Sequence, residues 1–170
     1  AGRDAEGHRL LGESYYQTGD FGRATESLRY AMERDLSLRD DLLPVLAEAE
    51  LHGTRRSADR SLAAIEKYLA IPTLDDRQRR LGQLIHVQSL LESDQFDEAK
   101  AVIDEQTAKI DSADLATQTN LAGDRDRLRL LDAERRVRRV IRQFGDQPGR
   151  AESGSLYGSS TVDSAVSRRT

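Results

Sequence analysis

The feature that most constrains the fold is a pair of helix-forming segments separated by a short turn near the N-terminus. Apolar residues in the first segment, residues 4–16, recur at the spacing of one buried helical face: Leu10, Leu11, Tyr15 and Tyr16. Gly19 can adopt the left-handed conformation that ends a helix, and Asp20 can accept the amide hydrogen bonds that begin the next one. A second helix is therefore expected over residues 21–34.

The second segment also carries one apolar face, formed by Phe21, Ala24, Leu28 and Ala31. The small Ala24 and Ala31 allow another helix to approach closely. The sequence therefore predicts two antiparallel helices that pack against each other through these faces.

Residues 5–38 resemble the tetratricopeptide repeat family. The residues that stand at the spacing of that family are Leu11, Gly12, Tyr15, Gly19, Asp20, Phe21, Ala24, Leu28 and Ala31. His8 occupies the place where the family often has Trp, and Leu36 occupies the place of its closing Pro. The resemblance implies a stack of helix pairs, in which each pair covers the apolar face of its neighbour.

A second unit is expected after the first, in a degenerate form. The 34-residue period of the family places Gly53 where the first unit has Gly19, and Leu62 where the first unit has Leu28. The helices of this unit are expected over residues 41–52 and 56–69.

A third unit is expected up to residue 110. Thr73 and Asp76 have the spacing of a capping box, which predicts the start of a long helix that ends near residue 93. Residues 94–99 then parallel residues 19–24 of the first unit. This match offsets the third unit by 41 residues from the second.

Residues 124–144 predict a C-terminal amphipathic helix, with the apolar residues Leu128, Leu131, Val137, Val140, Ile141 and Phe144. Its candidate basic face consists of Arg135, Arg138, Arg139 and Arg142. One interpretation is a capping helix that lays its apolar face on the third unit and pairs its arginines with acids one turn away. The other is a basic helix that binds an acidic protein, an anionic lipid surface or nucleic acid. The absence of an aromatic platform disfavours nucleic acid.

Composition agrees with thin helical layers, since 33% of the residues are charged, 37% are hydrophobic and Trp is absent. We therefore expect an all-α fold. Over residues 4–144, the repeats imply a right-handed superhelix of about three antiparallel helix pairs, closed by a C-terminal capping helix. Residues 145–170 are rich in Gly and Ser and are expected to be disordered unless a partner holds them.

The sequence contains no pattern typical of an enzyme. The absence of Cys excludes thiol nucleophiles and disulfides. His8, His52 and His86 fall on different predicted helices and lack the spacing of a helical metal site. No Gly-rich phosphate loop or nucleophile elbow occurs. We expect no enzymatic activity, no metal and no cofactor.

In the tetratricopeptide family the first helix of each pair lines a concave groove, so the resemblance implies ten exposed residues for partner binding. These are Arg9, Glu13, Tyr16 and Gln17 in the first unit, Leu43, Ala47 and Glu50 in the second, and Leu84, Gln88 and Leu91 in the third. Such a groove favours an amphipathic helix or an extended peptide with apolar anchors. The alternative is that the C-terminal helix, the tail or a second copy of the chain covers the apolar positions.

These observations predict a non-enzymatic scaffold or adaptor that binds a segment of a partner protein and belongs to a larger complex. The alternative is a regulatory or oligomerisation module of a larger enzyme or transcription regulator. The expected partner is another protein or a second copy of the chain. The net charge of -4 provides no overall attraction for nucleic acid, and membrane contact is expected only through a partner or the basic helix.

Two expectations concern the origin of the chain. A cytoplasmic location is slightly favoured, while the cell envelope or periplasm stays open because the sequence starts at Ala1 without Met. The excess of Arg over Lys is compatible with a GC-rich bacterial source.

Overall fold

The computed structural model describes residues 2–53 and 57–145, and these residues form helices and connections without any strand. The all-α expectation is confirmed for this part of the chain. The helices in chain order are α1 (Gly2–Gln17), α2 (Phe21–Arg34), the short 3-10 helix η1 (Leu36–Leu38), α3 (Arg39–His52), α4 (Ala58–Leu69), α5 (Asp76–Glu92), α6 (Phe96–Asp111), α7 (Leu115–Asn120) and α8 (Ala122–Gly145).

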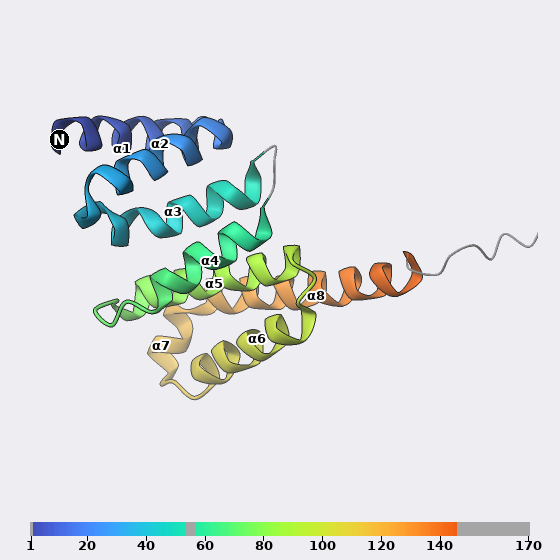
Figure 1. Ribbon diagram of the computed structural model, residues 1–170. Helices are drawn as coiled ribbons and strands as arrows, with labels where there is room; N and C mark the ends of the chain where they lie inside the picture. The colour runs from blue at the N-terminus through green and yellow to red at the C-terminus, as the bar shows by residue number, and fades with distance from the viewer. Residues whose placement is uncertain (1, 54–56, 146–170) are drawn as a thin grey trace, which may run out of the picture.

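Helices α1 to α6 stack in the order in which they occur along the chain, and α8 runs back beside α5 and α6 (Figure 1). Helices α1 and α2, α3 and α4, and α5 and α6 form pairs, and the second helix of each pair also contacts the first helix of the next. Helix α1 further contacts α3, α3 contacts α5, and α5 contacts α8. Helix α8 therefore occupies the place that the first helix of a fourth pair would take.

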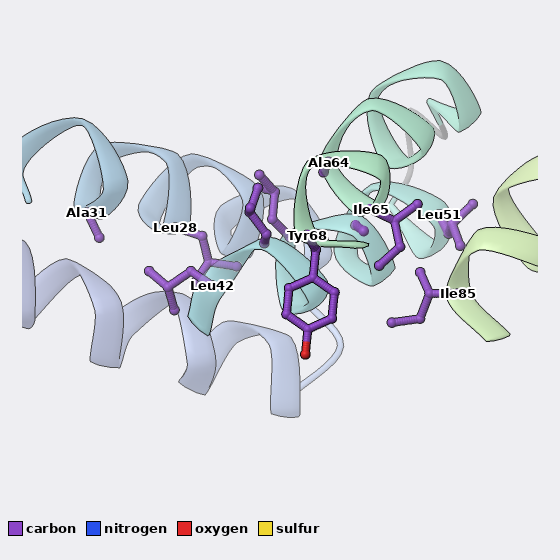
Figure 2. Packing of buried hydrophobic residues seen from close by; sticks show 11 residues of the cluster. Leu28, Ala31, Leu42, Leu51, Ala64, Ile65, Tyr68 and Ile85 are labelled. Carbon is purple, nitrogen blue, oxygen red and sulfur yellow. The ribbon is translucent and has the colours of Figure 1, made fainter. Parts of the chain in front are cut away.

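One core cluster joins α2, α3, α4 and α5. Leu28 and Ile65 are completely buried in it, and the hydroxyl-bearing ring of Tyr68 lies among aliphatic side chains. Figure 2 shows Leu28, Ala31, Leu42, Leu51, Ala64, Ile65, Tyr68 and Ile85 of this cluster. Burying one large apolar side chain contributes about 1.5–3 kcal/mol relative to exposure, so this cluster accounts for much of the adhesion between the first two pairs.

A second core cluster joins α5, α6 and α8. Its members are Leu84, Val87, Leu90, Leu91, Phe96, Ala99, Ile103, Ile110, Leu128 and Leu131. Helix α8 supplies Leu128 and Leu131, which are both nearly inaccessible to solvent. The end of the stack is thus covered by α8, as a capping helix requires.

The repeat interval in the structure differs from the expected one. The second helices of the pairs begin at residues 21, 58 and 96, so the intervals are 37 and 38 residues instead of 34 and 41. The buried positions recur at the same intervals, first Ala24, Ser61 and Ala99, then Leu28, Ile65 and Ile103. The expected register of the second unit, with Leu62 in the place of Leu28, is therefore wrong.

The error arises in the connection between α3 and α4. Gly53 has a φ of -65° and extended backbone, so it does not act as the left-handed helix end that Gly19 forms with a φ of 80°. Helix α4 begins only at Ala58, after a longer connection than the one between α1 and α2. Gly53 stands at the family period but does not form the expected helix-ending turn.

The turns of the first and third pairs have the same construction. Among the described residues, positive φ values occur at Gly19 and at Asp94, where φ is 59°. The amide of Asp20 donates to the carbonyl of Tyr15 at 2.9 Å, and the amide of Gln95 donates to the carbonyl of Leu90 at 2.9 Å. Both helices end in a Schellman-type turn. The expected match between residues 19–24 and 94–99 is confirmed.

Two helix starts also refine the expectations. Helix α2 has the expected bounds, because the Asp20 carboxylate accepts the amide of Arg23 at its first turn. The capping box of α5 is formed by Asp75 and Gln78 instead of Thr73 and Asp76. The carboxylate of Asp75 accepts the Gln78 amide at 2.7 Å, and the Gln78 side chain accepts the Asp75 amide at 3.0 Å.

The apolar residues of α8 do not share one face. Leu128 and Leu131 are packed on the body, but the expected capping residues Val137, Ile141 and Phe144 are 58%, 64% and 70% exposed. The last part of α8 projects beyond the ends of α5 and α6 (Figure 1). The expectation that all these residues cover the third unit is therefore wrong. The tail expected over residues 145–170 lies, from residue 146 on, outside the described residues.

Candidate functional site

The expected groove residues of the first unit lie on α1 with partly or fully exposed side chains. Arg9 is ion-paired with Glu6 and Glu13 of the same helix, at 2.6 Å in both cases. Tyr16 donates its hydroxyl hydrogen to the carboxylate of Glu48 on α3. Gln17 is exposed. This face of α1 is accessible, but its charges are already paired within the chain.

The Tyr16 hydroxyl marks the face along which α1 and α3 meet. Burial, followed by the hydrogen bond to Glu48, raises the pKa of Tyr16 to about 12, so the phenol remains a donor at neutral pH. The guanidinium of Arg127 on α8 acts in the opposite direction on the same pKa.

The expected groove residues of the second unit are buried, which corrects that prediction. Leu43 is 5%, Ala47 is 0% and Glu50 is 4% exposed. The reason is that α3 packs between α2, α4 and α5, which bury both of its flanks. The accessible side chains of α3 on the face of Tyr16 are instead Glu48 and His52, which sequence reasoning did not select.

Glu50 has a structural role in the described fold. Its carboxylate accepts hydrogen bonds from Arg29 on α2 and from Arg60 on α4, the latter at 2.9 Å. A buried carboxylate is tolerated when it is paired in this way. The contact joins three successive helices, and the carboxylate points into their interface.

In the third unit, Leu84 and Leu91 are also buried, whereas Gln88 is half-buried. Both leucines belong to the core cluster that includes Leu128 and Leu131 of α8. The expectation that they are exposed is wrong, and the alternative, in which the C-terminal helix covers them, is confirmed for these two residues. Of the three expected groove residues of the third unit, only Gln88 remains partly accessible to a partner.

The candidate basic face is an intramolecular ion-pair interface. Arg138 pairs with Glu92 of α5 at 2.7 Å, and Arg139 pairs with Asp97 of α6 at 2.8 Å. Arg135 is buried and contacts Asp132 at 2.9 Å, and Arg142 contacts Asp94 at 3.4 Å. The hydrogen bond that Arg138 donates to Glu92 is the main reason why the pKa of Arg138 is raised. This geometry favours the capping interpretation of the arginines, mainly through acids at the α5–α6 turn.

A hollow of about 240 Å³ lies where α3, α5 and α8 meet, and it is the candidate functional site. Its lining residues are Leu51, His52, Gln88, Leu91, Glu92, Glu134 and Arg138. Two expected groove residues, Gln88 and Leu91, thus meet one expected basic-face residue, Arg138. Sequence reasoning missed His52, Glu92 and Glu134. A repeat interval of 37 residues would not have identified His52 either, because it places His52 at the position of Tyr15, which is not an expected groove position.

A larger hollow of about 540 Å³ lies between α2, α3 and α4. Its lining residues are Arg29, Met32, Glu33, Leu36, Arg39, Leu43, Leu46, Arg60, Ala63, Ala64 and Lys67. Leu43 belongs to its floor, on the flank of α3 that faces α2 and α4. The rim carries four cations and one acid, of which Arg29 and Arg60 are paired with Glu50.

The three histidines lie on α1, α3 and α5, and each has different surroundings. The His8 ring packs against Tyr30, with ring centroids 4.1 Å apart, and the His52 ring packs against Phe21 at 5.5 Å. Burial lowers the pKa of His86, against a smaller opposing effect of Glu66, which favours the neutral ring. Within the described ranges, no three His, Asp or Glu side chains are grouped as metal ligands.

None of the described helices is both long enough and apolar enough to cross a lipid bilayer.

The chain matches no protein-family model, no curated protein sequence and no solved structure.

Proposed function

We propose that this chain is a non-enzymatic scaffold of the tetratricopeptide type, which binds a peptide or helix of a partner protein and acts as a component of a larger complex. The observation that carries the proposal is a series of contacts between helices: α1 contacts α3, α3 contacts α5, and α5 contacts α8. In a right-handed superhelix of helix pairs, this series lines the concave side, where such scaffolds bind their partners.

The chemistry of the hollow between α3, α5 and α8 supports a peptide ligand. Its volume of about 240 Å³ is below the roughly 300–1,000 Å³ of typical small-molecule sites, so it suits one anchoring side chain of a larger ligand. Leu51 and Leu91 form the apolar floor of the hollow, with 5% and 1% of their surfaces exposed. Gln88 and His52 carry donors and acceptors that match the backbone of an extended peptide or the end of a helix.

The first half of α8 and the face of α1 extend this site on both sides. Tyr16 and Glu48 lie towards α1, and Arg127 lies towards α8. Peptides bound along this face would meet polar groups at the α1 end and the apolar anchor site near α8. An amphipathic helix or extended peptide with one or two apolar anchors has this pattern.

A library of displayed peptides, selected against the wild-type chain, tests the proposal. Gln88→Trp fills the hollow and should weaken binding of the selected peptides at least tenfold. Leu115→Trp, on an exposed residue of α7, introduces the same side chain away from the site and should leave binding unchanged. The measurement is peptide affinity by fluorescence polarisation. If selection enriches no peptide, or if the peptides bind the Gln88→Trp variant as tightly as the wild type, the concave-site proposal is wrong.

A regulatory or oligomerisation module remains the second candidate function. The specific observation that favours oligomerisation is the exposed apolar face at the end of α8, which lies outside the peptide site.

A further inference from the structure

Helix α8 carries a second apolar stripe that no part of the described chain covers. Leu130 is 71%, Val137 is 58%, Val140 is 48%, Ile141 is 64% and Phe144 is 70% exposed. Single exposed apolar residues are ordinary, but five on one helix are not. Together they leave roughly 500 Å² of apolar surface, which equals the largest patch of a typical monomer.

The stripe has the spacing of a coiled-coil seam. Leu130, Ala133, Val137, Val140 and Phe144 alternate steps of three and four residues, which are the a and d positions of two heptads. Leu130, Val137 and Phe144 take the a positions. A core-facing helix of a globular protein shows a broader apolar face, whereas a seam of this width fits one partner helix.

The seam points away from the rest of the molecule. Successive residues of an α-helix are about 100° apart, so Val137 lies on the side opposite to Leu128, Leu131 and Arg135. Those three residues are buried against the body. Because the end of α8 also projects past α5 and α6, another helix can lie along it without displacing these contacts (Figure 1).

The charges beside the seam are complementary to those of a second copy in one orientation. Arg129 and Arg136 lie on one flank, at g positions, and Glu134 lies on the other flank, at an e position. In a parallel pair in register, each Arg129 faces Glu134 of the second copy, five residues further along, and the twofold axis creates two such pairs. In an antiparallel pair, arginine would face arginine and glutamate would face glutamate.

The present partners of these two residues do not prevent the exchange. Arg129 contacts Asp126 at 3.4 Å, and both side chains are more than two-thirds exposed. Glu134 contacts Arg138 at 2.8 Å, and its side chain is 44% exposed. Such surface pairs are weak, so a facing charge of opposite sign in the dimer can replace or share them.

We propose that residues 129–144 of α8 form a dimerisation helix, on which a second copy of this chain packs its own α8 in parallel and in register to form a short two-stranded coiled coil. This inference does not depend on the peptide site. The two bodies lie on the outer sides of the helix pair. Burying the stripe on both copies removes about 1,000 Å² from solvent, which is the area of a weak, transient interface, so we expect the dimer to dissociate on dilution.

Sedimentation velocity across roughly 1 to 300 µM protein tests the association. The wild type should change from monomer to dimer over this range. The double variant Val137→Asp, Ile141→Asp should stay monomeric throughout. Leu115→Asp changes another exposed apolar residue, 79% exposed on α7, and should dimerise like the wild type. Circular dichroism should show the helicity of the wild type for both variants, since none of the substituted side chains is buried.

The orientation has its own tests. Arg129→Glu alone and Glu134→Arg alone should each weaken the dimer, and an equimolar mixture of the two variants should restore it as a heterodimer. Because the chain has no Cys, Leu130→Cys and Phe144→Cys are unique thiols. Each should oxidise to a disulfide-linked dimer with itself. Cross-linking only between the two different variants would indicate an antiparallel pair and overturn the proposed arrangement.

Three results would overturn the dimerisation proposal. The first is a wild-type monomer at all concentrations. The second is a dimer that persists in the Val137→Asp, Ile141→Asp variant. The third is a monomer that binds vesicles of anionic phospholipid and loses this binding in the same variant, since the stripe would then be a membrane surface.

Discussion

The first and third helix pairs place the same positions in their cores but cross at different distances. Ala24 and Leu28 are buried in α2 as Ala99 and Ile103 are in α6. In the first pair the crossing point holds Gly12, and a Cβ atom added there would lie 2.7 Å from the Leu28 side chain. In the third pair the equivalent residue is Val87, which is completely buried in the cluster of Ile103.

This difference shows that equivalent positions are buried in both pairs, although the side chains that fill the space between the two helices differ. A glycine on one helix allows the partner's leucine to approach its backbone, and a valine requires a wider separation. The turns also differ in one residue. Gly19 and Asp94 adopt the same left-handed conformation, which is unstrained for glycine and strained for aspartate. Substitutions at the crossing, turn and cap residues of the two pairs test this interpretation.

The largest effect is expected for Gly12→Val. The new side chain must displace Leu28, whose Cγ and backbone amide are both within contact distance, so the free energy of unfolding should fall by about 3 kcal/mol. Urea unfolding followed by circular dichroism measures it. Gly7→Val on the same helix meets no atom within 4 Å and is the matched control. Equal losses for both variants would contradict the close crossing.

Val87→Ala should have the next largest effect. It leaves a cavity in the wider third pair, because Ile103 and its neighbours collapse only partly, and should lower the free energy of unfolding by about 2 kcal/mol. The same urea titration measures it. Val137→Ala, at a residue that is 58% exposed, should change the value by less than about 0.5 kcal/mol at concentrations where the chain is monomeric. If Val87→Ala lowered the free energy of unfolding as little as Val137→Ala does, the third pair would be loosely packed.

Exchanging the turn residues should produce smaller effects of opposite sign. Asp94→Gly relieves the left-handed conformation and should raise the free energy of unfolding by about 0.5–1 kcal/mol, while Gly19→Asp should lower it by a similar amount. Thermal unfolding of both variants, beside the wild type, provides the measurement. Effects of the same sign would show that the two turns are not equivalent.

The smallest effect is expected at the helix caps that follow these turns. The Asp20 carboxylate accepts the Arg23 amide at 3.2 Å, whereas Gln95 makes no side-chain cap for α6. Gln95→Asp should therefore stabilise the chain by about 0.5 kcal/mol, and Asp20→Gln should destabilise it by about the same amount. Thermal unfolding again measures both changes. A loss of stability in Gln95→Asp would indicate that α6 starts differently from α2.

The prediction from sequence succeeded where the structure depends on neighbouring residues. The end of α1, the bounds of α2 and the equivalence of the first and third turns follow from Gly19, Asp20 and Asp94, whose backbone preferences and caps act over a few residues. It failed in the second unit because Gly53 fits the family period but not the required conformation. The true register depends on Ser61 and Ile65, which only their packing partners identify.

The candidate site was predicted less well for the same reason. Gln88 and Arg138 were selected and do meet at one hollow, but Leu43, Glu50 and Leu91 are buried. Whether a residue on α3 or α5 is accessible depends on the helices on both sides of it. Residues far along the chain supply those helices, so local periodicity contains no information about them.

Helix α8 separates the two contributions most clearly. The sequence alone determined that residues 124–144 form a helix with apolar and basic residues at regular steps, because period and propensity are local properties. Only the tertiary structure decided that Leu128 and Leu131 face the body, that Arg138 and Arg139 pair with the α5–α6 turn, and that Val137 and Phe144 stay exposed. A helix with two apolar stripes can bury either one, and the shape and charge of the surface that receives it select between them.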